Sequence, residues 1–199
     1  MSAPKTLLQM AGAPLEPGKF SESAVVIIDA QNEYVNGKLP LPGVEAALDN
    51  IAILLKAARA ANAPIIHVQH KGRAGGLFDP GADAFKLAPQ AANEPGEAIV
   101  EKPLPNSFAQ TNLQDVLTKT GRKSLIVAGF MTHMCVSSTV RAALDLGYRT
   151  TVVADAAGTR DLPDPTGGPA LSAAELHRAA LAGLADRFAI VTNLAGLKT

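Results

Sequence analysis

Three reactive side chains stand where predicted β-strands end. Asp29 closes the apolar run 24–29. Lys102 follows a short third strand, and Cys135 opens the helix predicted after the strand 124–128. In an open parallel sheet the carboxyl ends of the strands face one crevice, so groups far apart in the sequence can meet there. A carboxylate, an ammonium and a thiol at that edge could carry out nucleophilic catalysis.

The cysteine has two interpretations. At a helix N-terminus, the thiol of Cys135 lies near the positive end of the helix dipole, and a nearby ammonium favours the thiolate further. Cys135 could then be a nucleophile at neutral pH. Alternatively it is buried as a small apolar side chain, as free cysteine commonly is. Asp29 stands at the end of an apolar run, where a carboxylate needs a cationic or hydrogen-bonding partner, and Lys102 is the candidate partner. Alternatively, Asp29 caps a structural element and Lys102 is a solvated surface residue.

Alternating strands and helices position these groups. Short β-branched runs indicate strands buried on both faces, and apolar residues at helical spacing indicate the helices between them. Because helical crossovers return each strand in the same direction, the predicted fold class is α/β, a Rossmann-like three-layer α/β/α sandwich with a six-stranded, mainly parallel sheet. The predicted strands are 24–29, 65–68, 99–102, 124–128, 150–154 and 188–191, and the helices 44–61, 111–120, 136–146 and 172–184.

The chain is predicted to form one domain, residues 23–199, preceded by an arm, residues 1–22. Prolines discourage regular structure in the arm, which either stays mobile or lies across a neighbouring subunit. Segments 71–97 and 158–169 lack firm periodicity and are expected to be irregular surface connections, where function is often found.

Composition excludes several classes of protein. The 199 residues carry 18 Lys plus Arg against 18 Asp plus Glu, so there is no basic footprint for nucleic acid or an anionic membrane. No apolar run approaches the roughly 18 to 20 residues that span a bilayer. One cysteine excludes an intramolecular disulfide and fits a reducing compartment. With no secretory signal pattern, the expected location is cytoplasmic and the expected partner a small-molecule substrate.

Four short segments resemble one protein family. They are 25–34 (VVIIDAQNEY), Lys102 with 106–108 (NSF), 129–136 (GFMTHMCV) and 155–156 (DA). Together they resemble the isochorismatase-like cysteine hydrolases, which include nicotinamidases and N-carbamoylsarcosine amidohydrolases, and the resemblance extends over about residues 24–195.

This resemblance implies a catalytic triad of Asp29, Lys102 and Cys135 in a six-stranded parallel sheet flanked by helices. It also implies a cis peptide bond from Phe130 to Met131, with the backbone N–H groups of Met131 and Cys135 forming an oxyanion hole. The reaction it implies is acyl transfer through a thioester, with Asp29 as the base and Lys102 orienting the carboxylate.

The sequence therefore predicts a metal-independent cysteine hydrolase that cleaves a C–N bond of a small carboxamide, ureido or carbamoyl compound. Two alternatives stay open. An isochorismatase-type vinyl ether hydrolase would not need the thiol, because that chemistry protonates an enol ether. A non-catalytic, oligomeric small-molecule-binding protein would have an unreactive Cys135. Alanine-rich helices and the family resemblance predict a homo-oligomer, a dimer or a tetramer.

Weaker signals surround the predicted triad. Gln31, Tyr34 and Phe108 follow strand ends and could line a substrate pocket, although aromatic residues are more often core. His133, in the turn before the nucleophile, could contact substrate or face solvent.

No metal or other cofactor is expected. Nicotinamidases resemble one another in an Asp-x-His metal motif followed by a further histidine. Here no aspartate stands two residues before His70 and no second histidine follows it closely. His67, inside a strand covered on both faces, is expected to have a hydrogen-bonded structural role.

Overall fold

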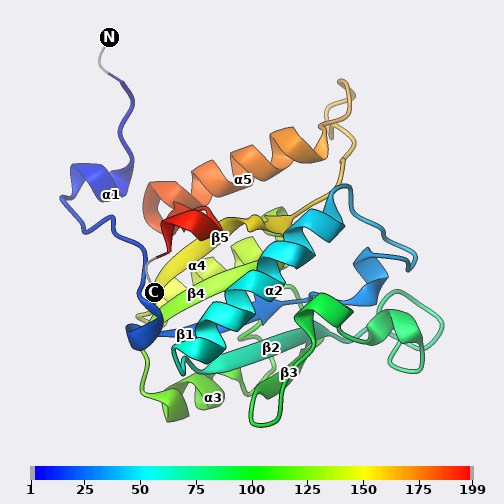
Figure 1. The fold of residues 1–199 in the computed structure, drawn as a ribbon. Coiled ribbons are helices and arrows are strands. Elements are labelled where there is room, and N and C mark those ends of the chain that lie inside the picture. Colours follow the sequence, from blue (N-terminus) through cyan, green and yellow to red (C-terminus); the bar gives the residue numbers. More distant parts are fainter. Residues whose placement is uncertain (1–2, 198–199) are drawn as a thin grey trace.

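The computed structural model describes residues 3–197 as a six-stranded, all-parallel sheet between two layers of helices (Figure 1). The strand order is β3-β2-β1-β4-β5-β6, so the chain starts at the centre, adds strands to one side, and then crosses to the other. The α/β sandwich is thus confirmed. The strands are β1 Ser23–Ile28, β2 Ile65–His70, β3 Ala98–Lys102, β4 Ser124–Phe130, β5 Arg149–Gly158 and β6 Ile190–Thr192.

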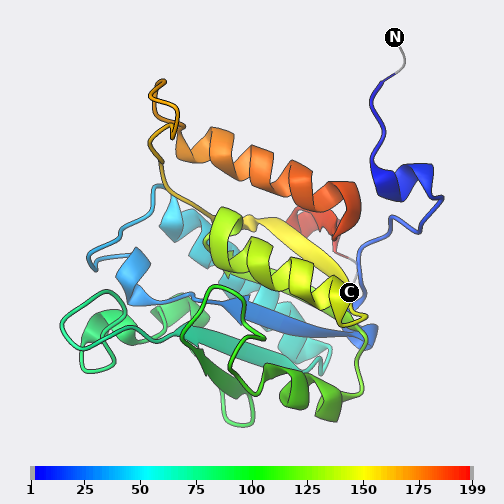
Figure 2. The same cartoon turned by 180° about the vertical axis from the view of Figure 1, so that it is seen from behind.

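Helices cover both faces of the sheet. The long helix α2 covers one face of the sheet, and its apolar stripe, which includes Leu48, Ile51 and Leu55, is buried in the core there. Helices α3, α4 and α5 cover the opposite face (Figure 2). The bounds are α1 Leu7–Met10, α2 Val44–Ala60, α3 Leu113–Thr120, α4 Ser137–Asp145 and α5 Ala173–Arg187. A capping box of Ser172 and Glu175 begins α5.

The order of strands reverses between β1 and β4. At such a switch point the two neighbouring crossovers leave on opposite faces of the sheet, which opens a crevice at the carboxyl ends of the strands. Asp29 directly follows β1, and the turn that carries Cys135 directly follows β4. The topology alone therefore brings these two residues to the two sides of one crevice.

Three strands reach farther toward the crevice than the apolar pattern indicates. β2 extends through Gln69 to His70, because the parallel ladder to β3 continues to the pair of His70 and Lys102. β4 extends to Phe130 and β5 to Gly158, and these two residues are also paired. The backbone hydrogen bonds between strands do not depend on side-chain polarity, so a prediction from hydropathy places the ends of these strands too early.

The described part of the arm, residues 3–22, packs against the rest of the chain. Although prolines discourage regular structure there, Thr6 and Gln9 form a capping box that supports the four-residue helix α1. The N–H of Leu7 donates to Oδ1 of Asp186 in α5 at 2.8 Å. Farther along, the N–H of Gly18 donates to a side chain of β5 at 2.8 Å. Figure 1 shows this segment beside the C-terminal end of α5.

The segment 71–97 is irregular but anchored. It contains two single helical turns, Asp83–Phe85 and Pro89–Ala91. The carboxylate of Glu33 is buried and accepts a hydrogen bond from the N–H of Phe78 at 2.8 Å. This contact ties the segment to the chain that follows β1, next to the crevice.

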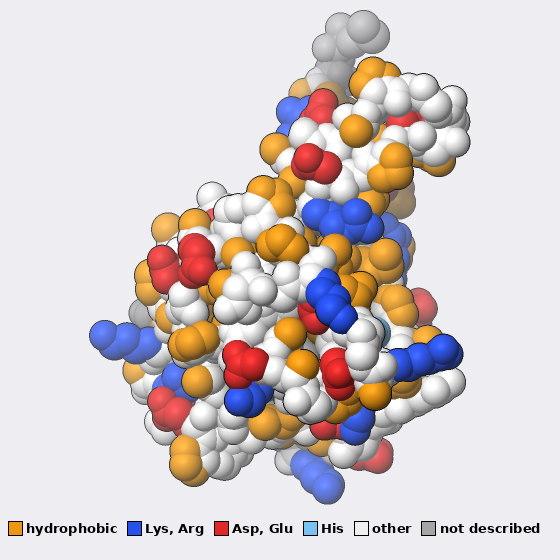
Figure 3. All heavy atoms as spheres, turned by 90° about the vertical axis from the view of Figure 1, so that its right-hand side faces the viewer, with side chains coloured by type: hydrophobic (Ala, Val, Ile, Leu, Met, Phe, Trp, Pro, Cys, Tyr) orange, Lys and Arg blue, Asp and Glu red, His pale blue; other side chains and the backbone are white. Residues whose placement is uncertain are grey.

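Charges are mixed on the surface. On the face drawn in Figure 3, acidic and basic side chains are interspersed among apolar ones, in line with equal numbers of the two signs. Within residues 3–197, no helix combines the length and the apolar character needed to cross a bilayer.

Gly129 in β4 is the residue on which the close approach of β1 and β4 depends. Its φ is +115°, and a Cβ there would lie 2.0 Å from the carbonyl oxygen of Ile28. The pairing of β4 with β5 also shifts register between Val127 and Gly129. No side chain therefore fits at this position without moving the strand that precedes Asp29.

We expect Gly129→Ala to lower the free energy of unfolding by about 3 kcal/mol or more, because overpacking and a disfavoured φ act together. Urea unfolding measures the loss. Gly81→Ala is the control, since its Cβ would meet only a side-chain oxygen at 3.4 Å. Equal stability of the two variants would contradict this account of β4.

Candidate active site

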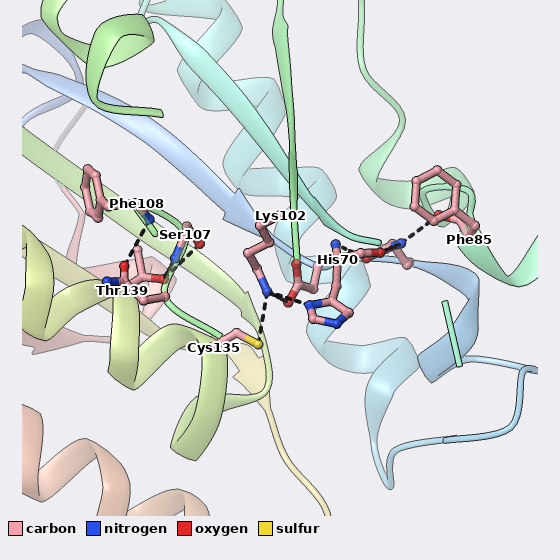
Figure 4. A network of polar contacts seen from close by, with 10 residues as sticks. His70, Phe85, Lys102, Ser107, Phe108, Cys135 and Thr139 are labelled. Atoms are coloured by element: carbon pink, nitrogen blue, oxygen red, sulfur yellow. Dashed lines mark hydrogen bonds and ion pairs between the residues drawn. The ribbon is translucent and has the colours of Figure 1, made fainter. Parts of the chain in front are cut away.

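The three predicted residues meet at the carboxyl edge of the sheet. Lys102 Nζ lies 2.7 Å from Oδ2 of Asp29 and 3.2 Å from Sγ of Cys135. Asp29 and Lys102 are fully buried, and Cys135 is 5% exposed. Figure 4 shows the Lys102 side chain reaching between Cys135 and a further residue, His70. The sheet edge thus assembles an acid, an ammonium and a thiol from three separate strands.

Asp29 is held in a conformation that few residues adopt. Its φ is +51°, in the left-handed region, which aspartate tolerates better than most side chains. Its N–H donates to the carbonyl of Val68 at 2.8 Å, so the backbone is tied to β2 at the point where β1 ends. Oδ2 forms an ion pair with the Lys102 ammonium, which is the charged partner of this buried carboxylate within residues 3–197. Such strain commonly accompanies functional sites.

Burial governs the protonation of the pair. Burial raises the pKa of Asp29, although the Lys102 ammonium acts in the opposite direction. Burial also raises the pKa of the Cys135 thiol to about 12, and the negative charge of Asp29 adds to that effect. Of the two interpretations of Cys135, the raised pKa favours a protonated thiol over a thiolate in the substrate-free site. Desolvation outweighs the ammonium, and the thiol keeps its proton.

The turn between β4 and α4 presents the thiol. The peptide bond from Phe130 to Met131 is cis. Residues Thr132–Val136 form a π-helical turn, a local feature that recurs at functional sites. The carbonyl of Met131 accepts hydrogen bonds from the N–H groups of Met134 and Val136.

The sequence model of the isochorismatase domain matches residues 23–196. The chain belongs to the isochorismatase family. An isochorismatase of known structure from Pseudomonas putida KT2440 is 45% identical with a TM-score of 0.94, over 98% of this chain and 100% of that one. A secreted isochorismatase effector from Verticillium dahliae is 42% identical over 92% of this chain and 94% of its own length. A ureidoacrylate amidohydrolase from Azorhizobium caulinodans is 29% identical over 68% of this chain and 75% of its own length.

Gln31 has a structural task in this isochorismatase-family site. It is fully buried, and its Oε1 accepts from the N–H of His70 at 2.8 Å. Its Nε2 donates to the carbonyls of His70 and Phe85 at 3.1 and 2.8 Å. Both amide protons are thus used by the backbone, which leaves no free donor for a substrate. The amide clamps the end of β2 to the segment 71–97.

The two predicted aromatic residues lie in different places. Tyr34 is buried, packs edge-on against Phe78 and Phe130, and lies close enough to Asp29 and the thiol for their charges to raise its pKa, together with burial. Phe108 stacks instead on Tyr148, with ring centroids 6.0 Å apart. Figure 4 shows Phe108 pointing away from Cys135. The structure thus brings Tyr34 to the site, whereas Phe108 is partly buried and packs against the apolar cluster on the α4 side of the sheet.

His133 lies beside the second irregular segment. Its Nδ1 is 2.5 Å from the hydroxyl of Thr159, and burial together with the charge of Arg160 lowers its pKa. The imidazole is therefore neutral at pH 7 and is held by a neighbouring loop. Direct contact of His133 with a substrate stays a prediction.

The other two histidines of interest have different surroundings. His67 Nε2 lies 2.9 Å from a carboxylate oxygen of Glu97, which confirms its hydrogen-bonded role in the core. Sequence reasoning considered His70 only as a metal ligand. Asp29, His70 and Cys135 each offer one possible ligand atom, and these three atoms lie within 4.8 Å of one another. The Lys102 ammonium, however, contacts all three residues. A positive charge already stands where a cation would bind, so this set fits a lysine better than a metal.

The protonated thiol has a testable consequence. We expect alkylation of Cys135 by iodoacetamide to be slow at pH 7 and to accelerate into the alkaline range, because the thiol pKa is raised to about 12. Asp29→Asn removes one negative charge that raises this pKa. Its alkylation should therefore reach half of its maximal rate at a lower pH, and each unit of pKa lowered should give about a tenfold faster reaction at neutral pH.

The alkylation rate is measured by intact-mass spectrometry over a pH series. Asp115→Asn, on the exposed side of α3, is the control for loss of an acidic residue. An unchanged midpoint in Asp29→Asn would show that the Asp29 charge does not act on the thiol.

Proposed function

We propose that this protein is a cysteine-dependent hydrolase that cleaves a C–N bond of a small carboxamide, ureido or carbamoyl substrate through a thioester. The observation that carries the proposal is the single buried ammonium of Lys102, which lies 2.7 Å from Asp29 and 3.2 Å from the thiol of Cys135. This arrangement supplies a nucleophile, a base for its proton, and a charge that offsets the base. The likeness to a ureidoacrylate amidohydrolase supports the same chemistry.

The first half of the reaction forms the thioester. As Sγ of Cys135 attacks the carbonyl carbon, its proton passes to the Asp29 carboxylate. The raised pKa of Asp29 makes it a stronger base than an exposed aspartate and so suits this transfer. The carbonyl oxygen becomes an oxyanion, for which the N–H groups of Met131 and Cys135 are the proposed donors. Loss of one such donor typically costs a reaction about 3 to 4 kcal/mol.

The second half releases the products. The tetrahedral intermediate collapses as the C–N bond breaks, and Asp29 returns the proton to the leaving nitrogen. Water then attacks the thioester while Asp29 accepts one of its protons. The carboxylic or carbamic product leaves, and the proton goes back to the sulfur. Lys102 stays charged throughout and keeps the carboxylate oriented.

A second function is favoured by a specific observation. The relative from Verticillium dahliae, 42% identical, is named an isochorismatase effector. Hydrolysis of a vinyl ether proceeds by protonation of the enol ether and requires no thiol. The two functions therefore differ in their dependence on Cys135.

We expect Cys135→Ala to lower ammonia release from a responsive amide by about a thousandfold or more, as is usual when a nucleophile is removed. A panel of small carboxamides, ureido acids and carbamoyl compounds is screened first with the wild-type protein. Wild-type protein quenched during turnover should also carry the acyl mass on Cys135. Ile99→Ala, at a 45% exposed position, is the control.

Retention of activity in Cys135→Ala, measured with isochorismate as the substrate, would support vinyl ether hydrolysis instead. Absence of turnover on both substrate classes, together with saturable binding of a panel compound, would favour the non-catalytic binding protein.

The pH profile tests the role of Asp29. The base must be ionised, so kcat/KM should fall as the pH drops through its pKa. Since burial raises that pKa, the midpoint of the acid limb should lie above 3.8, the ordinary value for aspartate. Because the thiol pKa is about 12, kcat/KM should show no change from thiol ionisation near pH 8 to 9. A rise in kcat/KM in that range would indicate a free thiolate as the attacking species.

A further inference from the structure

His70 contacts the triad without belonging to it. It is the last residue of β2 and is paired in register with Lys102 on β3. Its Nδ1 atom lies 3.2 Å from Lys102 Nζ (Figure 4). We propose that His70 is a positioning residue, whose Nδ1 accepts the third N–H of Lys102 and so centres the ammonium between Asp29 and Cys135. This inference rests on the proposed function of the same site.

Counting donors supports this role. A lysine ammonium has three N–H groups and no acceptor. Lys102 is fully buried, and its Nζ lies within 3.2 Å of three groups, the Asp29 carboxylate, the Cys135 sulfur and His70 Nδ1. The three N–H groups therefore face three acceptors: the sulfur and the imidazole through hydrogen bonds, and the carboxylate through an ion pair. Without His70, one buried donor would have no partner, and the ammonium would be free to move from the thiol toward the carboxylate.

The same contact fixes the tautomer of His70. An ammonium can only donate, so Nδ1 must carry a lone pair and the ring proton must lie on Nε2. Burial and the charge of Lys102 lower the pKa of this imidazole to about 4, which agrees with a neutral ring. A protonated ring would place two positive charges in contact, so the neutral form is the one that can hold the lysine.

The surroundings hold the ring in place. The side-chain amide of Gln31 binds both the N–H and the carbonyl of His70. The ring of Phe78 meets the imidazole edge-on, with centroids 5.0 Å apart. The backbone of Phe78 is in turn bound by the buried carboxylate of Glu33. His70 is thus fixed from its backbone and from its ring face, as a residue that positions another side chain should be.

Two substitutions distinguish the effect of the Nδ1 acceptor of His70 from the effect of the packing of its ring. His70→Asn places an amide oxygen close to the position of Nδ1 but removes the ring. His70→Phe keeps a ring against Phe78 but removes the acceptor. If His70 acts through its hydrogen bond, Asn should retain most of the wild-type kcat, whereas Phe should lose about 10- to 100-fold in kcat with little change in KM.

Activity is measured on the amide that responds best in the wild-type screen, and circular dichroism with thermal unfolding checks that both variants fold. A kcat of His70→Phe equal to or above that of His70→Asn would overturn the proposal, because packing alone would then explain the position. A kcat of His70→Asn clearly above that of His70→Phe, with both variants folded, would support the proposal.

A second measurement uses the wild-type protein and requires no turnover. Nitrogen-15 NMR of the imidazole should show a protonated Nε2 and an unprotonated Nδ1 for His70 between pH 6 and pH 8. A proton on Nδ1 would overturn the proposal even if both variants fail to fold. Absence of amidase activity in the wild type would refute the proposed function and leave the tautomer test of His70 intact.

Discussion

The burial of one ammonium determines the arrangement of the site. Lys102 is fully enclosed, and removing such a charge from water costs several kcal/mol unless acceptors replace the water. Asp29, Cys135 and His70 supply those acceptors, one for each N–H. Displacement of any of the three would leave a charged donor unsatisfied. The ends of β1, β2 and β3 and the turn after β4 must therefore be held in fixed relative positions.

Several independent backbone features around the site hold these strand ends in fixed relative positions. Gly129 lets β4 approach β1 more closely than a residue with a Cβ could. Gln31 ties the end of β2 to the segment 71–97. After β3, the N–H of Ser107 donates to the hydroxyl of Thr139 in α4, which joins the loop beyond Lys102 to the helix that follows Cys135. Together these features hold the chain around Asp29, His70, Lys102 and Cys135 in place.

The sequence predicted the sheet and placed Asp29, Lys102 and Cys135 at its edge, because both depend on local pattern and topology; the triad itself was implied by the family resemblance. Asp29 and Cys135 follow apolar runs, and parallel crossovers place the ends of such runs at one edge. The role of His70 depends on the register of β2 against β3, which periodicity does not specify. The position of Phe108 likewise depends on the three-dimensional path of the chain. It follows Lys102 closely in sequence, but the turn at 103–107 carries its ring away from the thiol to stack on Tyr148.

The protonation state of Cys135 also follows from three-dimensional burial rather than from sequence. The helix terminus and the lysine both favour a thiolate, yet desolvation and the neighbouring carboxylate raise the thiol pKa to about 12. One ammonium can offset one negative charge well, but ionised Asp29 and ionised Cys135 together would leave one charge uncompensated in the buried site. In the proposed reaction the site never holds both. The single negative charge moves from the carboxylate to the substrate oxygen as the proton moves from sulfur to carboxylate. The N–H groups of Met131 and Cys135 are the proposed donors to that charge, and as neutral groups they add no second cation to the buried site.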